Sequence, residues 1–145
     1  MGPSGLERFT DAQRDVYAQA LGELRAGAKR SHWMWFVFPQ LAGLGHSPTA
    51  RFYAIGGLGE AQDYLAHPLL GPRLAECTDA MLNWRGRRGA IAILGPVDAL
   101  KFRSSMTLFE LAAATPGSRF ADALDAFHDG QRDARTLQLL GRTDH

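Results

Sequence analysis

The chain has very little cysteine, and it lacks an excess of charge of either sign. Cys77 is the single thiol among 145 residues, so an internal disulfide is excluded and a reducing compartment is favoured. The 16 Lys and Arg residues and 15 Asp and Glu residues leave a net charge of +1. This balance lacks the broad basic surface typical of nucleic-acid-binding proteins, and the short arginine loop at 85–88 reads as a solvated loop. Nucleic acid is therefore not an expected partner.

Long apolar runs and targeting patterns are also missing. No stretch approaches the roughly 20 apolar residues that a membrane-spanning helix requires. The first residues, Met1 to Leu6, lack the charged and then apolar pattern of a signal peptide. We therefore expect a soluble, cytoplasmic protein with no membrane partner.

Motifs for metals and cofactors are absent from the sequence. The five histidines show no ligand spacing, and Cys77 stands alone. Gly43 and Gly45 lack the third glycine and the preceding strand of a dinucleotide-binding fingerprint, and Walker-type and zincin motifs are missing. The sequence therefore predicts no metal site and no cofactor.

What the chain does contain is the composition of one globular domain. Hydrophobic residues make up 46% of the sequence and charged residues 21%, and the length is common for a single domain. We expect one domain over residues 1–145, ordered over about 6–142 with frayed ends. Lysine is scarce: only Lys29 and Lys101 occur among the 16 basic residues, which sets these two apart.

Helix signals recur along the whole sequence. Thr10 to Gln13 resemble a capping box that opens a helix ending at Gly27. Ser47 and Pro48 form an N-cap and first-turn pair, and Ser118 is a second N-cap. Further helices are expected over 60–66, from 68 or 72 to about 84, over 96–114, and around 137–140. Together these signals predict an all-α fold, a single compact multihelical domain of short helices around a central helix at about 96–114.

The segment 32–38 is apolar on every side. Periodicity does not separate a buried helix from a buried strand there, and its aromatic content favours a strand. The rest of the chain offers no good strand partners, so a short buried helix is the preferred interpretation.

Polar residues lie within an apolar stripe of the central helix. At about 100° per residue, Lys101 and Ser104 fall in the stripe formed by Val97, Leu100, Leu108, Leu111 and Ala112, and Ser105 falls at its edge. Phe102, Met106 and Phe109 form a second apolar stripe, and Ala99, Arg103 and Glu110 share a solvent strip.

Two interpretations of these polar residues stay open, because an unpaired buried ammonium costs several kcal/mol. One is a pocket wall, with Lys101, Ser104 and Ser105 turned toward a ligand. The other is a structural pair of Lys101 with a carboxylate, with the serines bonded to the preceding helical turn.

Residues 31–40 are the second candidate stretch. Trp33 and Trp35 could stack on a planar ligand, with His32 beside them, and Gln40 could form paired hydrogen bonds with its edge. The alternative is a set of core aromatic residues with a satisfied histidine.

These same stretches resemble the motifs of a bacterial protein family, DUF1810. The similarity is carried by SHWMWFVFPQ at 31–40, Leu44, Gly45 and Ser47, and by the stretches at 64–71 and 101–109, with Phe102 in place of an expected Leu. It runs from about Leu6 to Arg142. The resemblance implies an all-helical fold but no activity, since the family is uncharacterised and some members carry a misleading calpastatin-like label.

The leading hypothesis is a pocket between segments 31–40 and 96–109 that binds, with or without a reaction, a small planar or anionic metabolite such as a nucleotide derivative. Lys101 would supply positive charge, Ser104, Ser105 and Gln40 hydrogen bonds, and Trp33 or Trp35 a stacking surface. His32 is the candidate general acid or base, because its unperturbed pKa lies near neutrality. An ion-paired Lys101, together with no cavity at His32, would overturn this hypothesis. The alternative is a non-enzymatic module for protein–protein interaction.

Overall fold

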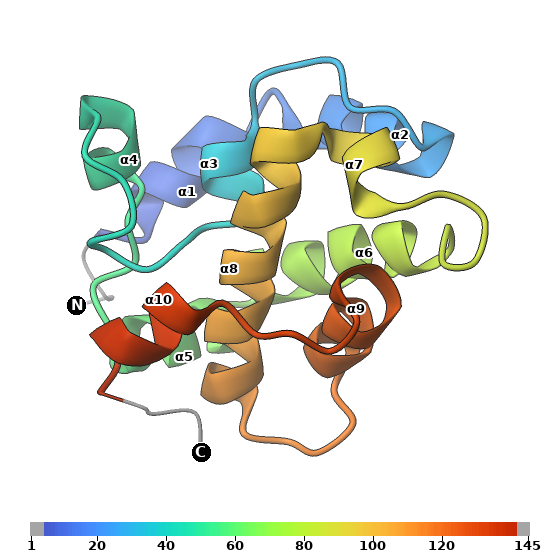
Figure 1. Ribbon diagram of the computed structural model, residues 1–145. Helices are drawn as coiled ribbons and strands as arrows, with labels where there is room; N and C mark the ends of the chain where they lie inside the picture. The colour runs from blue at the N-terminus through green and yellow to red at the C-terminus, as the bar shows by residue number, and fades with distance from the viewer. Residues whose placement is uncertain (1–4, 142–145) are drawn as a thin grey trace.

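The helix signals of the sequence correspond to an all-helical structure (Figure 1). The computed structural model describes residues 5–141, so the expected fraying at the two ends lies outside the described residues. Within this range the chain forms ten helices and no strand, and one β-bridge joins Leu41 to Ile55. The predicted all-α class is confirmed. The helices are α1 (Glu7–Gln13), α2 (Tyr17–Ala26), α3 (Met34–Val37), α4 (Pro48–Phe52), α5 (Leu58–Ala66), α6 (Leu70–Leu82), α7 (Ala90–Leu94), α8 (Pro96–Ala113), α9 (Arg119–His128) and α10 (Ala134–Leu139).

The longest helix, α8, runs through the middle of the domain, and α5, α7, α9 and α10 pack against it (Figure 1). Its side chains Phe102, Met106 and Phe109 are fully buried. The ring of Phe102 meets that of Phe38 edge to face, with the ring centroids 4.9 Å apart. The predicted central helix is therefore confirmed, and its second apolar stripe forms the heart of the core.

The predicted solvent strip of α8 is wrong. Ala99 is buried, and Arg103 and Glu110 are only partly exposed. The segment that joins α9 to α10 crosses this side of the helix, where Arg132 Nε donates to Glu110 Oε1 over 2.9 Å. A helical wheel does not include such a crossing, because it treats one helix in isolation.

The other stripe of α8 is split along its length. Leu108 and Ala112 are buried as expected, whereas Val97 and Leu100 are 65% and 61% exposed. The N-terminal half of this stripe is thus left open, and it faces the hollow described below.

The start of the first helix also differs from the expectation. Thr10 lies inside α1 and not at an N-cap, and α2 begins separately after Val16. Gln13 does not bond back to Thr10, because its buried amide donates to the carbonyl of Phe36 over 2.7 Å. Both residue types suit a cap, but here they serve the helix interior and the core.

Other predicted boundaries are confirmed. Gly27 ends α2 with a left-handed φ of 73°, a conformation that glycine adopts at low cost. Ser47 and Ser118 cap α4 and α9, each accepting a hydrogen bond from a backbone N–H. The segment 32–38 contains the short helix α3, as preferred. The five-residue helix α7 was not predicted, because it is a short apolar run between Gly89 and Gly95.

Among the described residues no helix has the length and apolar character needed to cross a bilayer.

Candidate functional site

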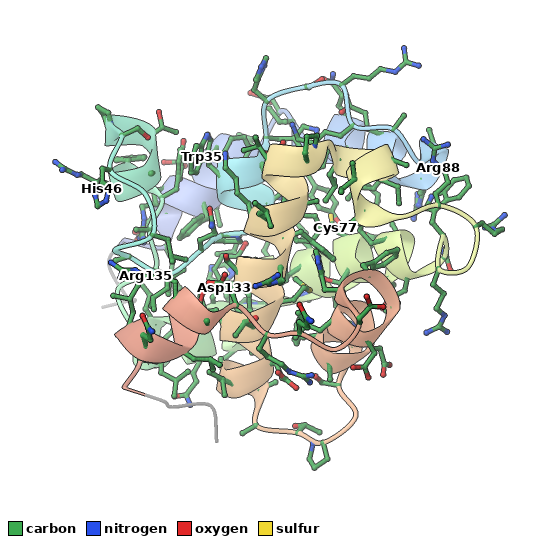
Figure 2. All side chains as sticks on the ribbon, viewed as in Figure 1. Trp35, His46, Cys77, Arg88, Asp133 and Arg135 are labelled. Atoms are coloured by element: carbon green, nitrogen blue, oxygen red, sulfur yellow. The ribbon has the colours of Figure 1, made fainter. Side chains whose placement is uncertain are left out.

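A hollow of about 370 Å³ lies beside the N-terminal half of α8. Four residues that the sequence analysis singled out line it: Trp35, Gln40, Lys101 and Ser104. The rest of the lining consists of Leu44, Gly45, Val97, Leu100, Asp133 and Arg135. In Figure 2, Trp35 lies next to the upper part of α8, Asp133 lies at the start of α10, and Arg135 lies in the first turn of α10. The two predicted stretches therefore meet at one hollow.

Lys101 lies directly on Trp35. Its Nζ is 3.5 Å from the centroid of the indole ring and 3.5 Å from Asp98 Oδ1. A cation over the face of a tryptophan is attracted to the ring by about 0.5–2 kcal/mol, more strongly where water is excluded. One face of Trp35 is thus covered by an ammonium group, and a planar ligand would stack there only after Lys101 had moved.

Asp98 is shared between the two lysines of the chain. Lys29 Nζ lies 2.9 Å from Asp98 Oδ2, and it also sits 5.1 Å from the centroid of the Trp33 ring. The side chains of Lys29, Asp98 and Lys101 are only 9%, 18% and 21% exposed. Two ammonium groups and one carboxylate sum to +1, so the ion pairing leaves one positive charge unbalanced within the cluster.

The two serines lie differently. Ser104 lines the hollow, and its hydroxyl donates to the carbonyl of Leu100 over 3.2 Å, as the structural interpretation expected. Its oxygen retains acceptor capacity toward the hollow. Ser105 is fully buried and does not line the hollow, and among the described residues its hydroxyl has no hydrogen-bond partner. Ser105 is therefore removed from the candidate site.

Trp33 and His32 also lie outside the hollow. Trp33 is fully buried, and its indole nitrogen donates to Glu23 Oε1 over 2.9 Å. His32 is exposed. Trp33 is thus a core residue anchored to α2, which matches the structural alternative for this segment.

Both observations that were expected to overturn the pocket hypothesis are therefore present. Lys101 is paired with Asp98, and the hollow does not reach His32. We therefore abandon the hypothesis in its original form, including the role of His32 as an acid or base. What remains is a hollow lined by Lys101, whose carboxylate partner Asp98 is shared with Lys29: Oδ1 contacts Lys101 and Oδ2 contacts Lys29.

The carboxylate that fixes Trp33 is strongly stabilised in its charged form. Burial alone would raise the pKa of Glu23, but hydrogen bonds from the Ser31 hydroxyl, the Arg30 amide, the Trp33 indole and the Ser31 amide lower that pKa to about 2. Glu23 thereby holds the turn at 30–33, which places α3 and Trp35 beside α8.

Asp133 and Arg135 were missed by the sequence analysis. Asp133 caps α10, because its Oδ2 accepts from the backbone N–H of Thr136 over 3.0 Å and from the Thr136 hydroxyl over 2.6 Å. An Asp followed three residues later by Thr at the start of an apolar run is a detectable helix-start signal. That α10 returns to α8 is a tertiary feature that no local pattern encodes.

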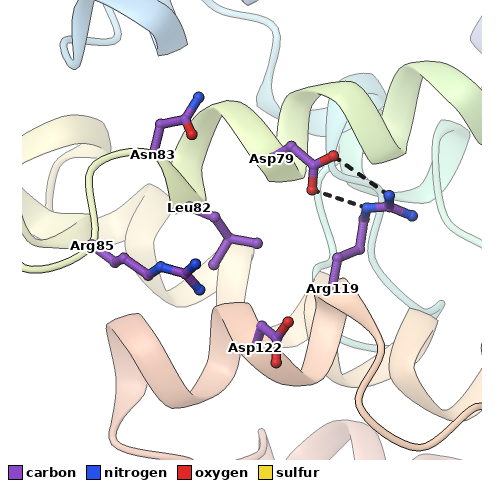
Figure 3. A pocket seen from close by; sticks show the side chains of 6 residues that line it. All are labelled: Asp79, Leu82, Asn83, Arg85, Arg119 and Asp122. Atoms are coloured by element: carbon purple, nitrogen blue, oxygen red, sulfur yellow. Dashed lines mark hydrogen bonds and ion pairs between the residues drawn. The ribbon is translucent and has the colours of Figure 1, made fainter.

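A second, larger hollow of about 560 Å³ lies between α6 and α9 (Figure 3). It is lined by Asp79, Leu82, Asn83, Arg85, Arg119 and Asp122. Asp79 and Arg119 satisfy each other there through bonds of 3.0 and 3.4 Å, and both are well exposed. With one apolar lining residue and its charges largely solvated, this hollow is the weaker candidate.

Comparisons with known proteins identify the family and the fold of the chain. A crystal structure of the conserved hypothetical protein Rv1873 from Mycobacterium tuberculosis has a TM-score of 0.90 and 52% sequence identity, covering 95% of this chain and 97% of that one. No curated protein matches the chain. The model of the family DUF1810, a protein family of unknown function, matches residues 3–140. The chain therefore belongs to the DUF1810 family.

Proposed function

We propose that the protein binds a small anionic metabolite with a planar or apolar part, such as a nucleotide derivative, in the hollow beside α8. The observation that carries this proposal is the lining itself. Trp35 and Gln40 come from one segment and Lys101 and Ser104 from another about 60 residues away, and all four border the same hollow.

The charges of the lining support an anionic ligand. Lys101 and Arg135 bring two positive charges to the hollow and Asp133 brings one negative charge, whose carboxylate is already engaged by Thr136. Asp133 Oδ1 also lies 4.0 Å from a guanidinium nitrogen of Arg103. An anionic group is attracted to such a surplus of positive charge, most strongly where the site is shielded from water.

The uncharged part of the lining supports a ligand with an apolar or planar body. Val97 and Leu100 present exposed side chains at the edge of the hollow, beside Leu44 and Trp35. Gln40 and the Ser104 oxygen offer hydrogen bonds for polar atoms on that body. This mixture of apolar walls and a few polar groups is usual for small-molecule sites.

A second candidate function is a module for protein–protein interaction. Ile91 on α7 and Val97 and Leu100 on α8 are large apolar side chains that are 64%, 65% and 61% exposed, and the two helices pack against each other. A peptide with acidic and apolar side chains would suit the same surface. This candidate predicts that small molecules leave the protein unaffected.

A thermal-shift screen against nucleotides, sugar phosphates, NAD derivatives and simple anions separates the two. A ligand at a hundred times its Kd adds about 2.7 kcal/mol, which raises Tm by roughly 5–10 °C for a domain of this size. We expect a shift with at least one anionic ligand, and its loss in Lys101→Met. The matched control Arg30→Met removes the same charge from an exposed position and should keep the shift. No shift across the whole panel would contradict the proposed function.

A further inference from the structure

We infer that Lys29, which does not line the hollow, determines how strongly the hollow binds the anionic group of its ligand. By holding Asp98, Lys29 leaves the charge of Lys101 available, so that the hollow accepts a single anionic group attached to an apolar body. This inference rests on the proposed function and names the ligand class and a positioning residue for that site.

The geometry of the cluster carries the first step. Asp98 is nearer to Lys29 than to Lys101, at 2.9 Å against 3.5 Å, so its ion pair with Lys29 is the closer of the two. Lys29 is also the least exposed of the three side chains, and its backbone N–H donates to the carbonyl of Ile93 over 2.8 Å. Lys29 and Asp98 therefore form the fixed pair, and Lys101 is the second cation.

The environment of Lys101 carries the second step. Its other neighbour is the face of Trp35, which attracts a cation without neutralising it. The carboxylate that it contacts is already balanced by Lys29. An anion entering the hollow at Lys101 would make the local charge zero, whereas without Lys29 the pair of Asp98 and Lys101 would already be neutral.

The lining beyond Lys101 indicates what is attached to that anion. Val97, about one turn before Lys101 on α8, and Leu100, directly before it, line the same hollow, and both are well exposed. An apolar body lying on these two side chains keeps its charged end at Lys101. A ligand rich in hydroxyl groups would cover them without a comparable gain.

Quenching of Trp35 fluorescence tests the charge directly, without knowledge of the natural ligand. Iodide is an anion and acrylamide is neutral, so the quenching constant of iodide divided by that of acrylamide increases with the positive electrostatic potential around the indole. A Trp84→Phe background removes the other partly exposed tryptophan, and Trp33 is fully buried. We expect the ratio to fall in Lys29→Met and in Lys101→Met, to rise in Asp98→Asn, and to stay unchanged in Arg30→Met. A ratio in Lys29→Met equal to that in Arg30→Met would overturn the inference.

Calorimetric titration with phenyl phosphate tests the ligand class. Benzyl alcohol, which lacks the anionic group, and inorganic phosphate, which lacks the apolar body, are the comparison probes. We expect the wild type to bind phenyl phosphate more tightly than either of the other two probes. The affinity for phenyl phosphate should be roughly tenfold lower in Lys29→Met and unchanged in Lys29→Arg, which restores the charge. Circular dichroism checks that each variant is folded. Unchanged affinity in Lys29→Met, with loss in Lys101→Met, would overturn the role of Lys29 and leave the proposed function standing. Failure of the wild type to bind any anion would overturn the ligand class together with the proposed function.

Discussion

At the scale of single residues, Glu23 shows how one carboxylate organises the approach to the site. Its pKa of about 2 lies below the ordinary value of 4.5, so its contribution to stability is complete above pH 4.5 and is lost as the pH falls toward 2. We expect Glu23→Gln to lower the free energy of unfolding by about 1–2 kcal/mol at pH 7, the lower range for hydrogen bonds to a charged group, because this carboxylate is partly solvated. Urea denaturation at pH values from 7 to 3 should show that the difference in the free energy of unfolding between the variant and the wild type decreases as the pH falls. The control is Asp63→Asn, at an exposed carboxylate on α5, and an equal effect there would argue against this account.

Cys77, in contrast to Glu23, is kept in its uncharged and unreactive form by its surroundings. It is fully buried in the core, and burial raises the pKa of its thiol to about 12. Since the thiolate is the reactive form, the folded protein should be inert to Ellman's reagent at pH 8. We expect labelling only after unfolding in urea, measured by absorbance. Rapid labelling of the folded chain would show that this part of the core opens readily.

At the scale of elements, α8 offers a matched pair of leucines on one stripe. Leu108 is fully buried and Leu100 is 61% exposed, although the helical wheel places both on the same face. We expect Leu108→Ala to cost about 2–5 kcal/mol in the free energy of unfolding, and Leu100→Ala less than about 1 kcal/mol. Urea denaturation of both variants measures the difference. Equal costs would mean that Leu100 is covered in solution, as it would be in an interface with a second copy.

The same helix shows what the sequence can and cannot predict. Caps such as Ser47 and Ser118 and the stop at Gly27 are local, since each is a contact within one turn, and they were predicted correctly. Lys101 and Ser104 could be predicted because burying a polar residue within an apolar stripe costs free energy unless that residue has a polar partner or a ligand. Thr10 was misassigned because its residue type suits both a cap and a helix interior. Arg135 escaped because it reaches the hollow only through the return of α10 to α8, some 30 residues along the chain.

At the scale of the whole molecule, the hollow beside α8 joins three distant parts of the chain, at 35–45, 97–104 and 133–135. A ligand that contacts all three stabilises their folded arrangement against local unfolding, so it should slow amide hydrogen exchange in all three together. We expect this joint protection with saturating phenyl phosphate, measured by mass spectrometry of peptic peptides, and its loss in Lys101→Met. Protection confined to 79–85 and 119–122 would instead place the ligand in the hollow between α6 and α9. That result would move the site away from the tryptophan and lysine residues on which the proposed function rests.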